Sequence, residues 1–269
     1  MMQLSDIRAG YAGREVLHGV SLAFRAGQVT ALVGPNGGGK STLLRCCARL
    51  LPYEGALLAA GRDARGCSPK EYARLAAYLP QSRPVPGLLA KTMVLHGRFA
   101  YLSYPRRYAD ADRAAVAAAL EKTGAAALAD KPMVSLSGGE RQRVYIAMAL
   151  AQDTPILLLD EPTANLDIAH QLQLMRLARQ LAAEGKTVVM VLHELNLALR
   201  FADRVALLEN GAVRAEGAPD GIAGCGALEQ VFGVCAQPVR DQNGETQYLF
   251  SQMERRGQER GIRTDEGKE

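Results

Sequence analysis

One short segment constrains the fold of this chain more than any other. Residues 34–42 read Gly-Pro-Asn-Gly-Gly-Gly-Lys-Ser-Thr and fit the pattern G-x-x-x-x-G-K-[ST]. An apolar run, Val29–Val33, precedes them, and the sequence that follows predicts a helix over residues 40–51. Glycines let the backbone curl so that successive N–H groups face one concavity, and the helix adds the positive end of its dipole. The segment therefore predicts a phosphate-binding loop between a strand and a helix.

The residues of this loop suit a nucleoside triphosphate and a metal ion. Lys40 would bridge the β- and γ-phosphates, and the Ser41 hydroxyl would ligate Mg²⁺. We therefore expect ATP and Mg²⁺ as ligands. A flexible glycine turn with a chance lysine is the alternative, and the strand and helix on its two sides argue against it. The nucleotide-binding residues expected in the loop are Gly34, Pro35, Asn36, Gly37, Gly38, Gly39, Lys40, Ser41 and Thr42.

A second apolar strand, at residues 156–159, runs directly into two acidic residues, Asp160 and Glu161. Two carboxylates at the end of a buried strand are costly unless a cation or a reacting group lies nearby. Asp160 suits the Mg²⁺ site, and Glu161 can align and deprotonate an attacking water. A solvated strand end is the alternative for this motif alone, but the phosphate-binding loop favours the catalytic interpretation.

Strand-like and helix-like segments alternate through much of the chain, which predicts an α/β fold with a mainly parallel sheet. Between about 84 and 152 the pattern is helical instead, with an alanine-rich helix at 112–123 and another that begins at Ser137. Asn210-Gly211 predicts a hairpin turn into a last strand at 212–215. The other strands are expected at 16–24, 29–33, 54–60, 77–79, 156–160, 187–192 and 204–208, and the later helices at 168–184 and 195–202.

Bulk composition narrows the class of protein. With 269 residues, 48% of them hydrophobic, the chain is expected to be globular, and a net charge of +4 is too small and diffuse to indicate a nucleic-acid partner. No apolar run approaches the roughly 18–20 residues of a membrane span, and the N-terminus lacks the features of a signal peptide. The five cysteines form no C-x-x-C pair and are expected to be reduced thiols, with a metal site or redox switch as the alternative. We therefore expect a cytosolic protein.

A third motif, Leu136-Ser137-Gly138-Gly139-Glu140, places a serine and two glycines at the start of a helix. Such a helix end is another anion site, although an ordinary helix cap would look the same. Together with residues 34–42 and the Asp160-Glu161 pair, this motif resembles the signature of the ATP-binding cassette (ABC) family, over roughly residues 3–217.

The resemblance implies a phosphate-loop NTPase core with an N-terminal antiparallel β subdomain and an inserted helical subdomain. It implies one ABC ATPase domain over residues 1–252, with the helical subdomain at about 84–152 and a short C-terminal extension at 219–252. Residues 253–269 carry charges and little to bury, so a disordered tail is expected there.

The resemblance also implies a head-to-tail dimer of two copies of the chain with two ATP sites. In that arrangement the signature of one copy closes over the ATP that the other copy holds. The residues expected to bind nucleotide in trans are Ser137, Gly138, Gly139 and Glu140.

Four further positions match the family. Gln81 resembles the glutamine that senses Mg²⁺ and the attacking water, and His193 resembles the histidine that contacts the γ-phosphate and orients the glutamate. Asp167 resembles the residue that couples the two sites across the dimer, and Tyr11 suits stacking on adenine. Taken singly, each has a plain structural alternative. The resemblance therefore implies that Glu161, His193 and Lys40 are catalytic and that Ser41, Gln81 and Asp160 form the metal site.

Scattered stretches, among them residues 92–98, 193–198 and 231–234, resemble importers of iron–siderophore, haem and cobalamin. This implies a polytopic permease partner at the cytoplasmic face of the membrane, docked near residues 81–87 and 92–99, and an indirect link to a substrate-binding protein. An importer of zinc or manganese shares much of the pattern. Two further interpretations stay open: a soluble ABC ATPase without a transport role, and a binding module without turnover.

Overall fold

Six strands form the central sheet of this computed structural model, which describes residues 1–242 and 244–252. Five strands run parallel and the last one, at the edge, pairs antiparallel with its neighbour. The prediction of a mainly parallel sheet is therefore confirmed. In spatial order the strands are β10 (Ala212–Gly217), β9 (Arg204–Glu209), β3 (Val29–Val33), β8 (Thr187–Val191), β7 (Ile156–Asp160) and β6 (Ala76–Leu79).

Both faces of this sheet are covered, which is why its central strands are apolar throughout. Every residue of β3, β7 and β8 is buried. Alternate residues of β7 belong to two separate cores. Leu157 and Leu159 pack with the helices on one face of the sheet, and Ile156 and Leu158 belong to the core on the opposite face. A strand buried on both faces loses the polar alternation of an exposed strand, so it appears in the sequence as a continuous apolar run.

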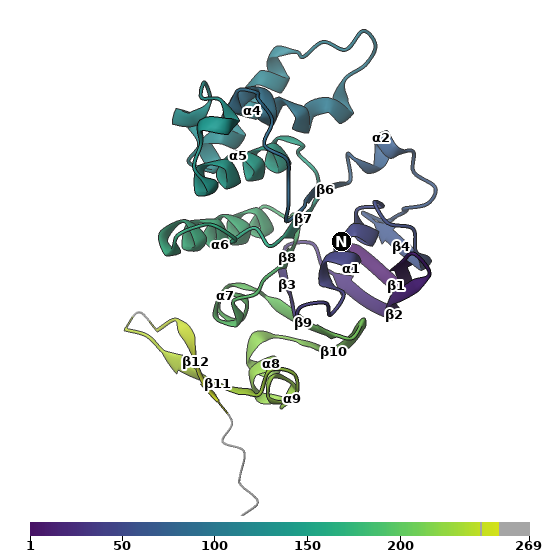
Figure 1. Ribbon diagram of the computed structural model, residues 1–269, viewed down its shortest axis with the longest axis vertical. Helices are drawn as coiled ribbons and strands as arrows, with labels where there is room; N and C mark the ends of the chain where they lie inside the picture. Colours follow the sequence, from purple (N-terminus) through teal and green to yellow (C-terminus); the bar gives the residue numbers. More distant parts are fainter. Residues whose placement is uncertain (243, 253–269) are drawn as a thin grey trace, which may run out of the picture.

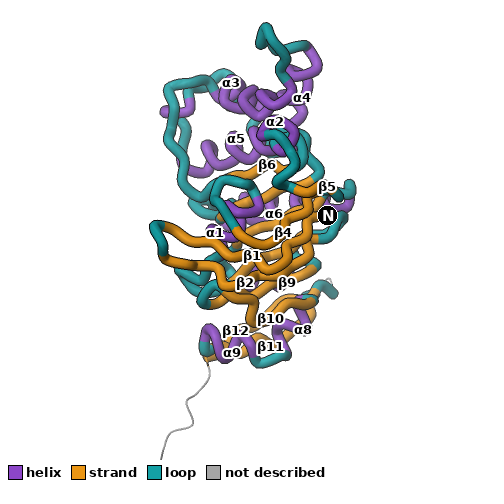
Figure 2. The backbone as a smooth tube through the Cα atoms, turned by 90° about the vertical axis from the view of Figure 1, so that its right-hand side faces the viewer, coloured by secondary structure: helices purple, strands orange, loops and turns teal. Residues whose placement is uncertain are grey.

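A second, antiparallel sheet lies at the N-terminal side and encloses helix α1 (Lys40–Cys47) against the central sheet (Figures 1 and 2). The helix is shorter than the predicted 40–51, because Arg49 has a positive φ of 57°, which an α-helix cannot continue through. A short helix, α2 (Pro69–Tyr72), follows this sheet. The strands of the antiparallel sheet, in spatial order, are β2 (Arg14–Phe24), β1 (Met2–Tyr11), β4 (Glu54–Ala59) and β5 (Arg62–Asp63).

A helical subdomain projects from one end of the molecule, at the top of Figure 1. The expected helix at 112–123 forms as α4 (Asp110–Lys122), and Ser137 caps the helix that it was expected to open, α5 (Gly138–Ala151). The inserted helical subdomain is therefore confirmed as part of the fold. Its other elements are α3 (Ala90–Leu95) and the 3-10 turns η1 (His96–Tyr101), η2 (Ala126–Leu128) and η3 (Met133–Ser135).

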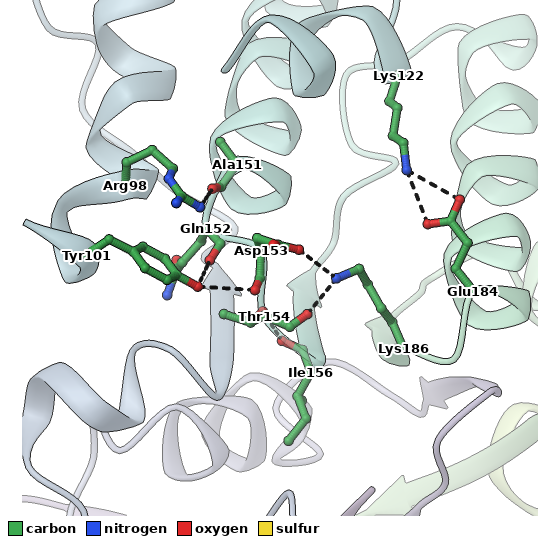
Figure 3. Close-up of polar contacts among 10 residues, drawn as sticks. All are labelled: Arg98, Tyr101, Lys122, Ala151, Gln152, Asp153, Thr154, Ile156, Glu184 and Lys186. Carbon is green, nitrogen blue, oxygen red and sulfur yellow. Dashed lines mark hydrogen bonds and ion pairs between the residues drawn. The ribbon is translucent and has the colours of Figure 1, made fainter. Parts of the chain in front are cut away.

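Polar contacts fix the point where the helical subdomain returns to the central sheet (Figure 3). The Tyr101 hydroxyl donates to the carbonyl oxygens of Gln152 and Asp153, at 3.0 and 3.2 Å. From the sheet side, Lys186 Nζ donates to Asp153 Oδ1 at 3.2 Å and to the Thr154 carbonyl at 2.9 Å. The end of α5 and the start of β7 are therefore held from both sides.

After β7 the chain carries four more helices and a hairpin. The first of these helices lies near the middle of the view, and the last two lie with the hairpin at the opposite end from the helical subdomain (Figure 1). The hairpin packs on the last three of these helices, and the Tyr248 hydroxyl donates to Asp220 Oδ1 at 2.5 Å. Residues 253–269, the predicted tail, lie outside the described residues. The elements are α6 (Ile168–Ala183), α7 (Leu195–Phe201), α8 (Pro219–Gly224), α9 (Ala227–Phe232), β11 (Val234–Arg240) and β12 (Thr246–Gln252).

Candidate functional site

The phosphate-binding loop leaves the carboxyl end of β3 and enters α1. Gly34 has φ 148° and Gly39, the residue before α1, has φ 99°. A Cβ atom at Gly34 would lie 1.9 Å from the Leu208 carbonyl oxygen of β9, so only glycine fits there. The loop is closed by the Gly38 N–H, which donates to the Pro35 carbonyl at 3.1 Å. Its tight course therefore depends on glycine at defined positions.

Lys40 lies over this loop. Its ammonium group donates to the carbonyl oxygens of Gly34, at 2.8 Å, and Pro35, at 2.9 Å. The residue is buried, and this burial lowers the pKa of Lys40, while the nearby Glu161 and Asp160 carboxylates act in the opposite direction. The loop thus positions the cation that is expected to contact phosphate.

Asp160, at the end of β7, is buried and uses both carboxylate oxygens. Ser41 Oγ donates to Oδ1 at 2.8 Å, and the Tyr78 hydroxyl donates to Oδ2 at 3.2 Å. Burial raises the pKa of Asp160, and burial together with this carboxylate raises the pKa of Tyr78 to about 12, so Tyr78 is a neutral donor at physiological pH. Tyr78 was not predicted from the sequence, because it belongs to no motif. The sequence offered only one indication of its role: Tyr78 lies near the carboxyl end of β6, the strand beside β7.

Glu161, the next residue, adopts a left-handed backbone conformation with φ 49°, which is strained for a residue other than glycine. Its carboxylate is held from two sides: Gln81 Nε2 donates to Oε2 at 2.6 Å, and His193 Nε2 lies 2.5 Å from Oε1. Gln81 follows β6 and His193 follows β8, the two neighbours of β7 in the sheet. The structure thus brings together three side chains that the sequence suggested separately.

An open cavity of about 1020 Å³ lies over these groups. Tyr11 is 41% exposed at its rim, and the Tyr11 hydroxyl accepts a hydrogen bond from Arg45 Nη1 at 3.0 Å. Gly34, Pro35 and Asp160, which were also expected at the site, are not among the lining residues. The lining residues are the expected Tyr11, Asn36, Gly37, Gly38, Gly39, Lys40, Ser41, Thr42, Gln81, Glu161 and His193, and the additional Arg14, Glu15, Val16, His18, Asn210 and Gly211.

The signature residues Ser137–Glu140 do not line this cavity. They form the N-terminal end of α5, where Ser137 Oγ accepts from the Glu140 N–H at 3.2 Å and Glu140 Oε2 accepts from the Ser137 N–H at 2.9 Å. A Cβ atom at Gly138 would lie 3.5 Å from the Cβ of Asn165, in the loop before α6. Within one chain, the signature is therefore a helix cap separate from the phosphate-binding loop.

Asp167 closes that same loop as the N-cap of α6. Its Oδ1 accepts a hydrogen bond from the His170 N–H at 2.8 Å and lies 2.8 Å from His170 Nδ1. These hydrogen bonds lower the pKa of Asp167. The candidate coupling residue thus directly follows Asn165 and Leu166, which neighbour the signature, and it is exposed at the surface.

The polar groups near the phosphate-binding loop suit one kind of metal ion. The Ser41 hydroxyl, the Asp160 carboxylate and the Gln81 amide offer hard oxygen ligands, which Mg²⁺ prefers. All five cysteines are free thiols. Within residues 1–242 and 244–252, no group of three or more His, Cys, Asp or Glu side chains lies close enough together to hold a metal ion.

Comparison with known proteins gives one consistent family. Residues 17–164 match the family model described as ABC transporter. The chain is 43% identical, over 89% of its length and 90% of the relative, to the iron(3+)-hydroxamate import ATP-binding protein FhuC of Bacillus subtilis. It is 47% identical, over 87% of its length and 82% of the relative, to the hemin import ATP-binding protein HmuV of Streptomyces coelicolor. Among solved structures, the dimeric bacterial ABC transporter cassette MJ0796 matches with a TM-score of 0.73 and 29% identity, over 81% of this chain and 99% of that one.

Proposed function

This chain belongs to the ABC transporter family, and we propose that it is the ATP-hydrolysing subunit of an importer of metal chelates. The observation that carries the hydrolytic part is the Glu161 carboxylate, which Gln81 and His193 hold at the wall of the cavity above Lys40. A module that only bound nucleotide would need no carboxylate held in this way.

Different residues of the cavity would serve different steps of hydrolysis. The loop N–H groups and Lys40 bind the β- and γ-phosphates, and the Tyr11 ring stacks on adenine. Glu161 orients the attacking water and accepts its proton, while His193 contacts the γ-phosphate. Because both Glu161 oxygens have partners at 2.5 and 2.6 Å, the plane of its carboxylate is set before the nucleotide arrives.

Magnesium fits the oxygen groups beside the loop. Ser41, Asp160 and Gln81 would hold it. When bound, Mg²⁺ neutralises charge that develops on the phosphate oxygens. The Ser41 hydroxyl and Asp160 carboxylate are already 2.8 Å apart through their hydrogen bond, which keeps both groups directed to the same point beside the phosphate-binding loop.

A second copy of the chain completes the site. Ser137, Gly138, Gly139 and Glu140 lie away from the cavity of their own chain, so they would contact the ATP of a partner. Asp167, in the loop that contacts the signature, would couple the two sites. The dimeric solved cassette to which this chain is similar supports such an arrangement.

A separate permease is the second partner. Among the described residues, every helix is too short or too polar to cross a bilayer. A cavity of about 480 Å³ lies between α2 and η1, and the half-exposed Phe99 lines it. We propose that this region receives a permease helix at the cytoplasmic face of the membrane, and that a substrate-binding protein delivers the cargo to the permease.

The names of the similar proteins favour a metal chelate as cargo. One is named for iron(3+)-hydroxamate import and the other for hemin import. A zinc or manganese importer is the alternative within the family, and a soluble ABC ATPase is the alternative outside transport. Residues 1–252 would form the one ABC ATPase domain, with its helical subdomain at about 84–152 and its extension at 219–252.

Deletion and complementation test the proposal. Cells that lack this gene should lose uptake of radiolabelled ferric hydroxamate or hemin, and the wild-type gene should restore it while Glu161→Gln does not. Uptake of labelled zinc, measured in the same cells, should be unaffected. A tagged chain should also co-purify from membranes with a polytopic protein. Loss of zinc uptake alone would contradict chelate import, and absence of any membrane partner would favour the soluble alternative.

A further inference from the structure

Helix α1 directs two side chains toward the ends of β6 and β7. Ser41 and Arg45 are four residues apart and therefore share one face of the helix. Ser41 donates to Asp160 Oδ1. The Arg45 guanidinium donates to the Tyr11 hydroxyl at 3.0 Å. Tyr78 and Arg45 have no role in the motifs of the site, yet each contacts a residue that has one.

The Tyr78 hydroxyl is well placed to orient Asp160. It donates to Oδ2 at 3.2 Å, while Ser41 occupies Oδ1 at 2.8 Å, so the two contacts together fix the rotation of the carboxylate. Asp160 is 1% exposed, which leaves water little access to replace a lost donor. A buried carboxylate oxygen that loses its donor becomes costly to keep in place. The direction of Asp160 toward the phosphate-binding loop thus depends on Tyr78.

We propose that Tyr78 is a positioning residue for the metal carboxylate Asp160, and that Arg45 positions Tyr11. The proposal rests on the proposed function, because it assumes that Asp160 serves Mg²⁺ and that Tyr11 stacks on adenine. Tyr78 donates to Asp160 Oδ2, and Arg45 donates to the Tyr11 hydroxyl. Two residues outside the motifs would therefore hold the side chains at the metal end and at the adenine end of the nucleotide.

Tyr78→Phe removes the hydroxyl and keeps the ring that packs in the core. The affinity for a fluorescent ATP analogue is measured in EDTA and then across a Mg²⁺ titration, with the full chain. Groups that orient a metal ligand typically contribute 10–100-fold to metal affinity. We therefore expect Tyr78→Phe to weaken the apparent Mg²⁺ affinity by about 10–100-fold and to leave the affinity measured in EDTA unchanged.

Tyr72→Phe is the matched control. The Tyr72 hydroxyl is also buried in this part of the molecule, but it donates to the Cys47 carbonyl and not to the site. This variant should keep the Mg²⁺ dependence of the wild type even if its melting temperature falls. Equal shifts of Mg²⁺ affinity in the two variants, a Tyr78→Phe protein with normal Mg²⁺ affinity, or one that loses ATP affinity in EDTA to the same extent would overturn the assignment.

Arg45→Met tests the link to Tyr11. It should weaken ATP affinity in EDTA through Tyr11, and a variant with unchanged ATP affinity in EDTA would overturn this role of Arg45. The same titration on the wild type distinguishes a failure of this proposal from a failure of the proposed function on which it rests. If wild-type ATP binding does not respond to Mg²⁺ at all, the magnesium site itself is wrong, and the assignment of Tyr78 is wrong with it.

Discussion

The Lys40 ammonium group is held by two carbonyl oxygens of its own loop, so its position does not depend on the nucleotide. In the proposed function, charge on the transferred phosphate develops beside Lys40, and a cation already fixed there would need no rearrangement during the reaction. The same loop requires glycine at position 34, because a side chain there would meet β9. The course of the loop backbone therefore depends on having glycine at position 34.

Replacing Lys40 should abolish hydrolysis. Lys40→Ala removes the cation, and the loss of one preorganised group of this kind lowers the rate by at least about 100-fold. ATPase assays on purified protein check this, with Lys91→Ala as the control, because Lys91 pairs with Asp130 at the surface and does not line the cavity. Near-normal turnover in Lys40→Ala would show that the loop is not the phosphate site.

Single residues differ in how far the sequence reveals them. Lys40, Ser41 and Asp160 belong to motifs whose spacing carries their chemistry, so they could be named before the fold was known. Tyr78 and Arg45 could not, because each acts through a contact between elements that are far apart in the chain. The positive φ of Glu161 was equally invisible, since no local pattern requires it.

Among the elements, the start of α4 depends on a buried ion pair in the helical subdomain. Arg98 of η1 donates to Asp112 Oδ1 at 2.9 Å, with both side chains about one-tenth exposed, and Arg98 also donates to the Ala151 carbonyl at 3.0 Å (Figure 3). Asp112 Oδ2 accepts from the Ala109 N–H at 2.9 Å. One carboxylate thus caps α4 and joins it to η1, and η1 is joined in turn to the end of α5.

Asp112→Ala should destabilise the protein by about 3 kcal/mol, because it leaves the Arg98 charge buried without its partner. The hydrogen bond from Ala109, followed by that from Arg98, lowers the pKa of Asp112 in the folded state. The stabilisation is therefore present above the unfolded pKa of about 4 and is lost as the pH falls through the lower folded value. Urea unfolding at pH 7 and pH 3 should show a difference between wild type and variant that shrinks in acid.

The exposed Asp110 at the same end of α4 is the control for this prediction. It lies 3.7 Å from Arg113 and is fully exposed, so Asp110→Ala should leave the urea midpoint unchanged. A variant of Asp112 that unfolds like the wild type at pH 7, or a difference that grows in acid, would contradict the role given to the pair.

The β9–β10 turn supports the phosphate-binding loop from outside. The Gly211 N–H donates to the Gly38 carbonyl at 3.2 Å, and the Gly211 carbonyl accepts from the His18 N–H of β2 at 3.0 Å. Gly211 has φ 71°, and a Cβ atom there would lie 1.9 Å from the Val16 carbonyl oxygen. This one residue therefore joins the central sheet, the antiparallel sheet and the loop.

Gly211→Ala should weaken ATP affinity by about tenfold, or roughly 1.4 kcal/mol, because the turn must move away from Gly38. Gly61→Ala is a matched control: Gly61 has φ 78° in the equivalent turn between β4 and β5, with nothing within 4 Å of an added Cβ. Both variants should melt at lower temperature, whereas titration calorimetry should show weaker binding only for Gly211→Ala. Equal affinities would mean that the turn does not support the loop.

Element by element, the sequence was most informative where burial imposes a pattern. The apolar runs of β3, β7 and β8 could be located because both faces of each strand are covered. The hairpin of β11 and β12 was not predicted, because Pro238 interrupts the strand pattern and few of its residues are buried. The end of α1 was placed too late, since nothing local announces the left-handed conformation of Arg49.

At the scale of the whole molecule, the phosphate-binding loop and the signature lie in different places. The phosphate-binding loop opens into the large cavity, while the signature at the start of α5 takes no part in lining it. The family resemblance predicted this division, but spacing along one chain could not, because the second half of each site would come from another copy. The cargo is not predictable from the site residues either, since the proposed function assigns them to ATP.

The central claim is that ATP is enclosed between the loop of one chain and the signature of another. Glu161→Gln should still bind MgATP but should not hydrolyse it, so the nucleotide would keep two copies together. Size-exclusion chromatography with light scattering should then give a dimer with MgATP and a monomer without it, and the double variant Lys40→Ala, Glu161→Gln should stay monomeric in both. A Glu161→Gln protein that binds MgATP and remains a monomer at concentrations well above its affinity for ATP would contradict the account.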